Sequence, residues 1–169
     1  MSLFHLLKSV DQPVCLFFVG VPAVGKSTYA KEIAEQFPDR FAVISTDDHI
    51  ERLCAKAGLT YSQGFGTYVD QAQHSMDEDL NLALAAQRDV IWDQTNTSKK
   101  VRMKKLGKIP ENYLKIAVYF DHTMLAEGEL KRRLDARPGK NIPPTVMQSM
   151  LTSMTAPTRD EGFDQIFVR

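Results

Sequence analysis

Hydrophobic residues along the chain fall into short continuous runs that alternate with segments of helical periodicity. The runs have the length of buried strands and are rich in β-branched and aromatic residues; they span 14–19, 41–44, 89–92, 114–120 and 163–168. Apolar residues spaced three or four positions apart predict helices over 27–37, 48–57, 67–87, 98–105, 123–136 and 144–154. We predict a glycine-containing loop over 61–66.

Continuous rather than alternating apolar strands indicate a parallel sheet that is covered on both faces. Strands that alternate with helices, joined by right-handed crossovers, make a doubly wound α/β fold. We therefore predict a five-stranded parallel sheet within a single domain, residues 1–169. In such folds the ligand binds at the carboxyl ends of the strands, so polar residues that follow the strands are the candidates for chemistry.

Residues 20–28 follow the first apolar run and read GVPAVGKST, which matches the phosphate-binding P-loop pattern G-x-x-x-x-G-K-[ST]. Gly20 and Gly25 allow the backbone to curl so that successive N–H groups point at one anion. Lys26 is expected to reach the β- and γ-phosphates, and the Ser27 hydroxyl to hold Mg²⁺. The sequence thus predicts a site for ATP or another nucleoside triphosphate with Mg²⁺; the other loop residues expected to contact the nucleotide are Pro22, Ala23, Val24 and Thr28.

Carboxylates follow the second and third apolar runs. Asp47 is placed to accept the proton of an attacking hydroxyl group, and Asp48 is placed to cap the next helix. Asp93 ends the third run, where a carboxylate contacts either Mg²⁺ or the incoming hydroxyl group, and the sequence does not separate these roles. Thr95 and Asn96 extend this cluster as candidate substrate contacts.

Two arginines lie one helical turn apart before a segment rich in glycine and proline. Arg133 and Arg137 would therefore project from one face, and we predict a mobile lid over approximately 131–144. An arginine in a lid can close over the transferring phosphate and neutralise its developing charge. A second cationic run, 99–108, is either a solvated face or a surface that tracks a phosphodiester backbone.

Composition narrows the function classes. The formal net charge is zero, so no global field draws the chain to nucleic acid or to a membrane. Cys15 and Cys54 do not make a disulfide framework, which favours a reducing, cytoplasmic compartment. The apolar runs are too short to span a membrane, and no protein partner is evident. The histidines lack metal-ligand spacing and no G-x-S-x-G turn is present, which argues against metallohydrolase and acyl-transfer chemistry.

As a whole the pattern resembles the polynucleotide 5′-kinases of bacteriophage type, within the P-loop kinases. The matching pieces are GVPAVGKST at 20–28, STDD at 45–48, DQTN at 93–96, RLDARPGKNIP at 133–143, the helix from Val146 and EGFD at 161–164. They occur in the same order over nearly the whole chain. The P-loop is common to many enzymes, whereas the D-D, D-x-T-N and R-x-x-x-R pieces together are more specific.

The resemblance implies an ATP-dependent kinase of P-loop type, in the cytoplasm of the host cell if phage-encoded, that acts on DNA or RNA. By it, Asp47 matches the general base, Lys26 and Ser27 the phosphate and Mg²⁺ ligands, and Asp93 an acceptor-site carboxylate. Arg137 matches the lid arginine that stabilises the transition state, and Arg133 a second lid arginine. The segment 157–163 would lie near the adenine.

One departure from the family leaves the acceptor open. The family usually has an arginine three residues after the base, where this chain has Ile50, and Arg52 is the nearest candidate acceptor contact. Related phage enzymes phosphorylate 5-hydroxymethyluracil within DNA, a DNA modification, and a small hydroxylated metabolite or nucleoside is a further possible acceptor. A nucleotide-binding switch ATPase is the competing class of protein. Arg137 argues against it, because this chain supplies the arginine itself and needs none from a partner.

Overall fold

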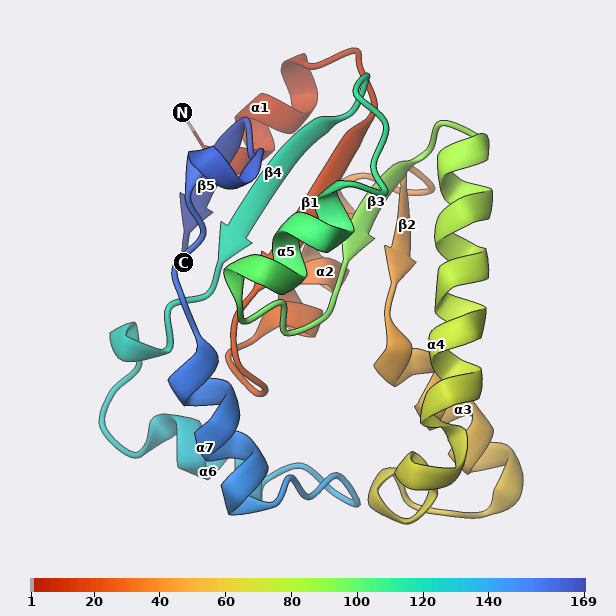
Figure 1. Ribbon diagram of the computed structural model, residues 1–169, viewed down its shortest axis with the longest axis vertical. Coiled ribbons are helices and arrows are strands. Elements are labelled where there is room, and N and C mark those ends of the chain that lie inside the picture. The colour runs from red at the N-terminus through yellow and green to blue at the C-terminus, as the bar shows by residue number, and fades with distance from the viewer. Residues whose placement is uncertain (1) are drawn as a thin grey trace.

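The computed structural model describes residues 2–169 and contains one sheet of five parallel strands (Figure 1). The strand order is β2-β3-β1-β4-β5, with β1 at the centre. The predicted parallel sheet is therefore confirmed. The strands are β1 (Val14–Val19), β2 (Phe41–Ile44), β3 (Asp89–Trp92), β4 (Leu114–Tyr119) and β5 (Gln165–Val168).

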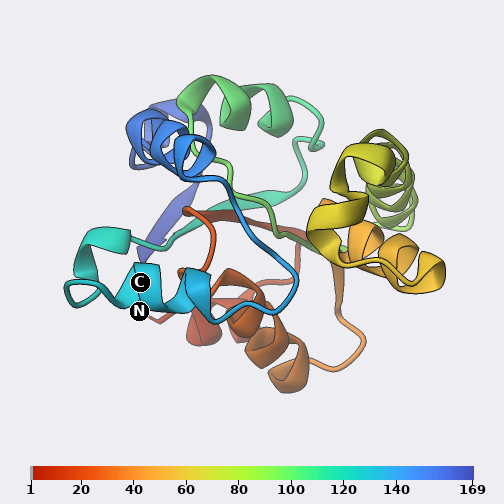
Figure 2. The ribbon, with the colours of Figure 1, turned by 90° about the horizontal axis from the view of Figure 1, so that it is seen from below.

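Helices cover both faces of this sheet, as Figure 2 shows. One face packs against α1 (Leu3–Ser9) and α2 (Lys26–Gln36). The other packs against α4 (Tyr61–Ala85) and α5 (Lys99–Leu106), and α3 (Thr46–Ala57) lies against α4. The remaining helices are the 3-10 turns η1 (His122–Met124) and η2 (Arg159–Glu161), and the α-helices α6 (Glu129–Asp135) and α7 (Pro144–Ser153).

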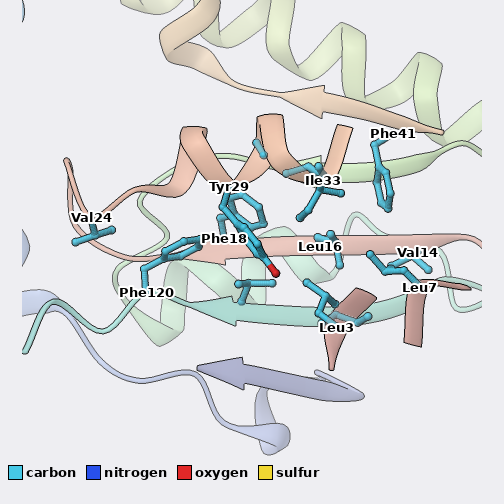
Figure 3. Close-up of a cluster of buried hydrophobic side chains, with 14 of the residues drawn as sticks. Leu3, Leu7, Val14, Leu16, Phe18, Val24, Tyr29, Ile33, Phe41 and Phe120 are labelled. Carbon is cyan, nitrogen blue, oxygen red and sulfur yellow. The ribbon is translucent and has the colours of Figure 1, made fainter. Parts of the chain in front are cut away.

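The central strand β1 is buried on both faces because its alternate side chains enter different clusters. Leu16 and Phe18 point into the cluster beneath α1 and α2, drawn in Figure 3. Cys15 and Phe17 enter the opposite cluster, where the Phe17 ring centroid lies 5.2 Å from that of Trp92. Each large apolar side chain so buried contributes about 1.5–3 kcal/mol. This two-sided burial explains the unbroken apolar run.

The start of α4 corrects the sequence prediction, because residues 61–66 form helix and not a loop. Thr60 caps this helix in a capping box with Gln63, and this local signal outweighs the two glycines that follow. Gly64 is required by packing: a Cβ placed there would lie 2.4 Å from Cys54 Sγ. A glycine in a helix interior can therefore mark a close helix–helix approach and not a break.

Two further corrections concern helix boundaries. Ser45 is the N-cap of α3, and its hydroxyl accepts from the Asp48 amide, so the predicted capping role of Asp48 is wrong. The predicted helix 123–136 is interrupted at Gly128, which has a φ of 75°. The helix α1 was not predicted. No helix among residues 2–169 is both long enough and apolar enough to cross a membrane.

All five strands point the same way, so their carboxyl ends meet at one edge of the sheet, the lower edge in Figure 1. The helices α3, α6 and α7 lie at that edge. Residues 136–143, which join α6 to α7 and are called here the lid segment, cross it to reach the corner between α3 and α4. The predicted lid, 131–144, thus comprises most of α6 and this segment.

Candidate active site

A cleft of about 1370 Å³ lies at the carboxyl edge of the sheet. It is bounded by the loop before α2, the start of α3, the residues after β3, and α6 with the lid segment. The structure brings most of the predicted site residues together in it: Pro22, Ala23, Val24, Gly25, Lys26, Ser27, Thr28, Asp47, Asp93, Thr95, Arg133 and Arg137.

The loop before α2 curls through two left-handed residues, Ala23 with a φ of 68° and Gly25 with a φ of 104°. Gly25 is also the N-cap of α2, and no side chain caps this helix, in contrast to α3, α4 and α5. The first N–H groups of α2 are therefore left for a ligand. An uncapped helix start behind a curled loop is a ready-made anion site.

Lys26 folds back over its own loop. It is buried, and its Nζ donates to the carbonyl oxygens of Gly20 at 3.0 Å and Val21 at 2.9 Å. Burial lowers the pKa of Lys26 to about 8, although the carboxylates of Asp93 and Asp47 favour the charged form. The ammonium group thus lies beside the anion site, in a position from which it can bind phosphate oxygens.

Ser27 and Asp93 lie next to each other at the start of α2 and the end of β3. Asp93 is 8% exposed, and its amide donates to the Ile44 carbonyl at 2.9 Å, which fixes the end of β3 against β2. Burial raises the pKa of Asp93, while the Ser27 hydroxyl and the charge of Lys26 act to lower it. A hydroxyl and a carboxyl oxygen are ligands that Mg²⁺ accepts, so these residues fit the ion.

Asp47 lies in the first turn of α3, with both carboxylate oxygens engaged. Tyr61 donates its hydroxyl to Oδ1 at 2.7 Å, and the ammonium of Lys140 binds Oδ2. Burial acts to raise the pKa of Asp47, but Lys140, Tyr61 and the charge of Arg137 outweigh it and lower the pKa. The carboxylate is therefore ionised at neutral pH, as a proton acceptor must be.

The lid arginines approach the loop before α2. A Cβ placed on Gly25 would lie 3.9 Å from Arg133 Nη1, so this guanidinium lies over the loop. Arg133 Nε also donates to Glu129 at 2.6 Å, which holds the side chain along α6. The charge of Arg137 lowers the pKa of Lys26, so it too acts on the anion site.

Three predicted contacts have structural roles and do not line the cleft. The Gly20 amide donates to the Thr95 carbonyl at 2.9 Å. A Cβ placed on Gly20 would lie 3.0 Å from Phe120 Cβ. Asn96 is 1% exposed, and its Nδ2 donates to the Phe18 carbonyl at 2.7 Å, which ties the loop after β3 to β1. Arg52 bonds the Asp48 carbonyl and the His49 ring on the outside of α3.

The cationic run 99–108 is not a uniformly solvated face. Arg102 is fully buried against Glu161, and Lys105 Nζ binds Gln94 and Asn96. At the surface, Lys99 pairs with Asp160 and Lys108 with Asp77. The segment 157–163, expected near the adenine, packs through η2 on α5 and does not line the cleft.

Sequence reasoning missed Tyr61 and Lys140, which bind Asp47 from α4 and from the lid segment. The sequence predicts a loop at Tyr61, and a loop gives no direction for the side chain. Lys140 lies within the motif RLDARPGKNIP, and its place in a lid beside two arginines was the available signal.

The sequence model of the AAA domain family (AAA_33) matches residues 16–157, which contain the loop before α2, Asp47, Asp93 and the lid. The chain belongs to this family. Among curated relatives, the mouse and the human heterogeneous nuclear ribonucleoprotein U-like protein 2 are each 23% identical to this AAA-domain protein, over an alignment of 167 residues that covers 94% of the chain. The chain spans about a fifth (22%) of the length of these relatives.

Solved structures share the fold of this AAA-domain protein. A putative kinase from Chloroflexus aurantiacus has a TM-score of 0.68 at 16% identity, over 95% of this chain and 86% of that one. A chain of the Pnkp1/Rnl/Hen1 RNA repair complex gives 0.64 at 24% identity, over 86% and 45%. A gluconokinase from Sinorhizobium meliloti gives 0.56 at 18% identity, over 94% and 83%. The fold is thus that of P-loop kinases.

Proposed function

We propose that this protein is an ATP-dependent kinase that transfers the γ-phosphate to a hydroxyl group of a polynucleotide, at a 5′ end or on the hydroxymethyl group of a modified base. One arrangement supports this proposal above all. An ionised carboxylate, Asp47, lies in the same cleft as the uncapped start of α2, with Lys26 and Arg137 beside it. The likeness to a chain of an RNA repair complex agrees with a nucleic-acid acceptor.

The residues divide the reaction between them. Asp47 accepts the proton of the acceptor hydroxyl as its O–H bond breaks and the new O–P bond forms, while the bond between the β-phosphate oxygen and the γ-phosphorus breaks and ADP leaves. Lys26 and Arg137 stabilise the charge that develops on the transferring group. Ser27 and Asp93 would hold Mg²⁺, which supplies further neutralisation of the phosphates when bound. The lid segment excludes water from the transfer.

A small hydroxylated metabolite is the second candidate acceptor. The pairing of cations in the run 99–108 favours it. Four of the six cations in this run, Lys99, Arg102, Lys105 and Lys108, are paired within the molecule, which reduces the charge available to follow a phosphodiester backbone. The gluconokinase with the same fold agrees with this alternative.

The test offers γ-labelled ATP with three acceptor classes: 5′-OH DNA and RNA oligonucleotides, a duplex containing 5-hydroxymethyluracil, and a panel of hydroxylated metabolites. Label on either nucleic-acid class supports the proposal, and label on a metabolite alone replaces the acceptor. Label found only in free phosphate, whatever acceptor is present, contradicts the proposal that the protein is a kinase and favours a switch ATPase.

A matched pair of variants separates transfer by this cleft from a contaminating activity. Asp47→Asn removes the proton acceptor at almost unchanged shape, whereas Asp70→Asn makes the same change at an exposed position of α4. Transfer that is lost in the first variant and kept in the second assigns the activity to the cleft.

A further inference from the structure

The lid segment places an ammonium group directly on the candidate base. Lys140 is 8% exposed, and its Nζ binds Asp47 Oδ2 and lies 3.2 Å from Glu51 Oε1. The same Nζ lies 4.0 Å from the centroid of the Tyr61 ring. Lysine is seldom buried to this extent unless it is paired. Two carboxylates and an aromatic face therefore make a defined site for this one ammonium group.

Backbone contacts on either side of Lys140 dock the lid segment onto the first turn of α4. The Ser62 amide donates to the Gly139 carbonyl at 3.0 Å, and the Asn141 amide donates to Ser62 Oγ at 2.8 Å. These bonds fix the backbone while the lysine side chain reaches α3. The docked lid segment thus joins residues far apart in sequence, 47 and 140.

We propose that Lys140 is a positioning residue for the phosphoryl transfer, which holds the Asp47 carboxylate in its reactive place whenever the lid segment is docked. The inference rests on the proposed function. A carboxylate offers about four lone-pair positions. Tyr61 and Lys140 occupy one on each oxygen, so positions remain for the acceptor hydroxyl. The docking of the lid segment then also places the Asp47 carboxylate for proton transfer.

The charges around Asp47 support this role. Burial acts to raise the pKa of Asp47, and Lys140 gives the strongest opposing effect through its charge and its hydrogen bond. Removal of this ammonium therefore raises the pKa of Asp47. The titratable and charged groups that face Asp47 are Lys140 and Arg137 from the lid segment, Tyr61 from α4, Asp48 and Glu51 from α3, Lys26 from α2, and Asp93 after β3.

The first test compares pH–rate profiles of three variants, with ATP and the acceptor that takes the label. Lys140→Met keeps the apolar stem without the charge, Lys140→Arg keeps a charge, and Lys56→Met changes an exposed lysine at the far end of α3. We expect Lys140→Met to lower kcat about 10-fold or more. Its acid limb should move to higher pH by about one unit, since a neighbouring cation lowers a carboxyl pKa by about that much or more.

Lys140→Arg should return the acid limb toward that of the wild type, and Lys56→Met should match the wild type. A merely structural role of Lys140 would lower the rate without moving the limb. An active Lys140→Met protein with an unmoved acid limb therefore overturns the inference and leaves the proposed function intact. Absence of transfer by the wild type overturns the proposed function itself.

Amide exchange provides a second readout that needs no turnover. The Asn141 amide is protected by its bond to Ser62, and loss of the lysine anchor should let the lid segment open more often. We expect faster hydrogen exchange at Asn141 in Lys140→Met than in Lys56→Met. Equal exchange rates in the two variants would show that Lys140 does not hold the lid segment, and would also overturn the inference.

Discussion

A buried ion pair behind the cleft permits a quantitative prediction for Arg102→Met. The side chains of Arg102 and Glu161 are both 0% exposed, and the guanidinium donates to the two carboxylate oxygens at 2.7 Å each. It also donates to the carbonyl oxygens of Asn96, Thr97 and Thr155 at 2.9–3.1 Å. Arg102 thus joins α5 to the loop after β3 and to the segment before η2.

Removal of one partner of such a pair leaves an uncompensated buried charge, which costs about 3–5 kcal/mol. The total stability of a typical domain is about 5–15 kcal/mol. For a chain of this size each kcal/mol corresponds to roughly 2–4 °C, so Arg102→Met should lower Tm by roughly 6–20 °C. Lys104→Met, an exposed change on the same helix, should stay within about 0.5 kcal/mol.

Urea unfolding followed by circular dichroism measures both variants, together with the double variant Arg102→Met/Glu161→Gln. Because the main penalty is the unpaired charge, neutralising Glu161 should recover about half of the loss or more. A loss below about 1 kcal/mol for Arg102→Met would refute the reasoning. So would a double variant that is no more stable than the single one.

Three further predictions follow from single residues. Asp47→Asn should keep ATP binding and lose transfer about 100-fold or more, measured by label transfer and by nucleotide titration. Burial acts to raise the pKa of Glu161, but its arginine partner outweighs burial and lowers the pKa. The wild type should therefore be more stable than Glu161→Gln in urea unfolding at neutral pH. This difference in stability should shrink as the pH falls below about 4.3, where the carboxylate takes up a proton. Gly64→Ala should destabilise the protein by about 1–3 kcal/mol, because the new Cβ would lie 2.4 Å from Cys54 Sγ. Gly66→Ala should stabilise α4 by about 0.5–1 kcal/mol, because a Cβ placed there meets nothing within 4 Å. Thermal unfolding measures both variants.

The sheet and the phosphate loop could be predicted because their signals are local. A strand such as β1, buried on both faces, needs an unbroken apolar run, and the loop before α2 needs glycine where φ reaches 104°. At the start of α4 two local signals conflict, because the capping box of Thr60 and Gln63 favours a helix and the glycines that follow favour a loop. Gly64 reads as a helix breaker in sequence, and only the approach of Cys54 from another helix explains it.

The sequence predicts which residues belong to the candidate site, but it does not predict the directions in which their side chains point. Asn96 and Thr95 are neighbours after β3, yet Asn96 turns inward to the Phe18 carbonyl while Thr95 lines the cleft. The backbone of Asn96 is left-handed, with a φ of 48°. Lys140 meets Asp47 across 93 positions of sequence, a contact that no spacing rule contains.

The distribution of cations bears on how an acceptor can be recognised. Lys26 and Lys140 are directed into the cleft, while Arg102 and Lys105 are drawn into the body behind it. Each of these side chains is bound to carbonyl or carboxylate oxygens, so a count of basic residues overstates the charge that is free for phosphates. The cleft lining carries cations of its own, among them Arg133 and Arg137, beside aromatic and apolar side chains, and we expect the acceptor to be recognised there.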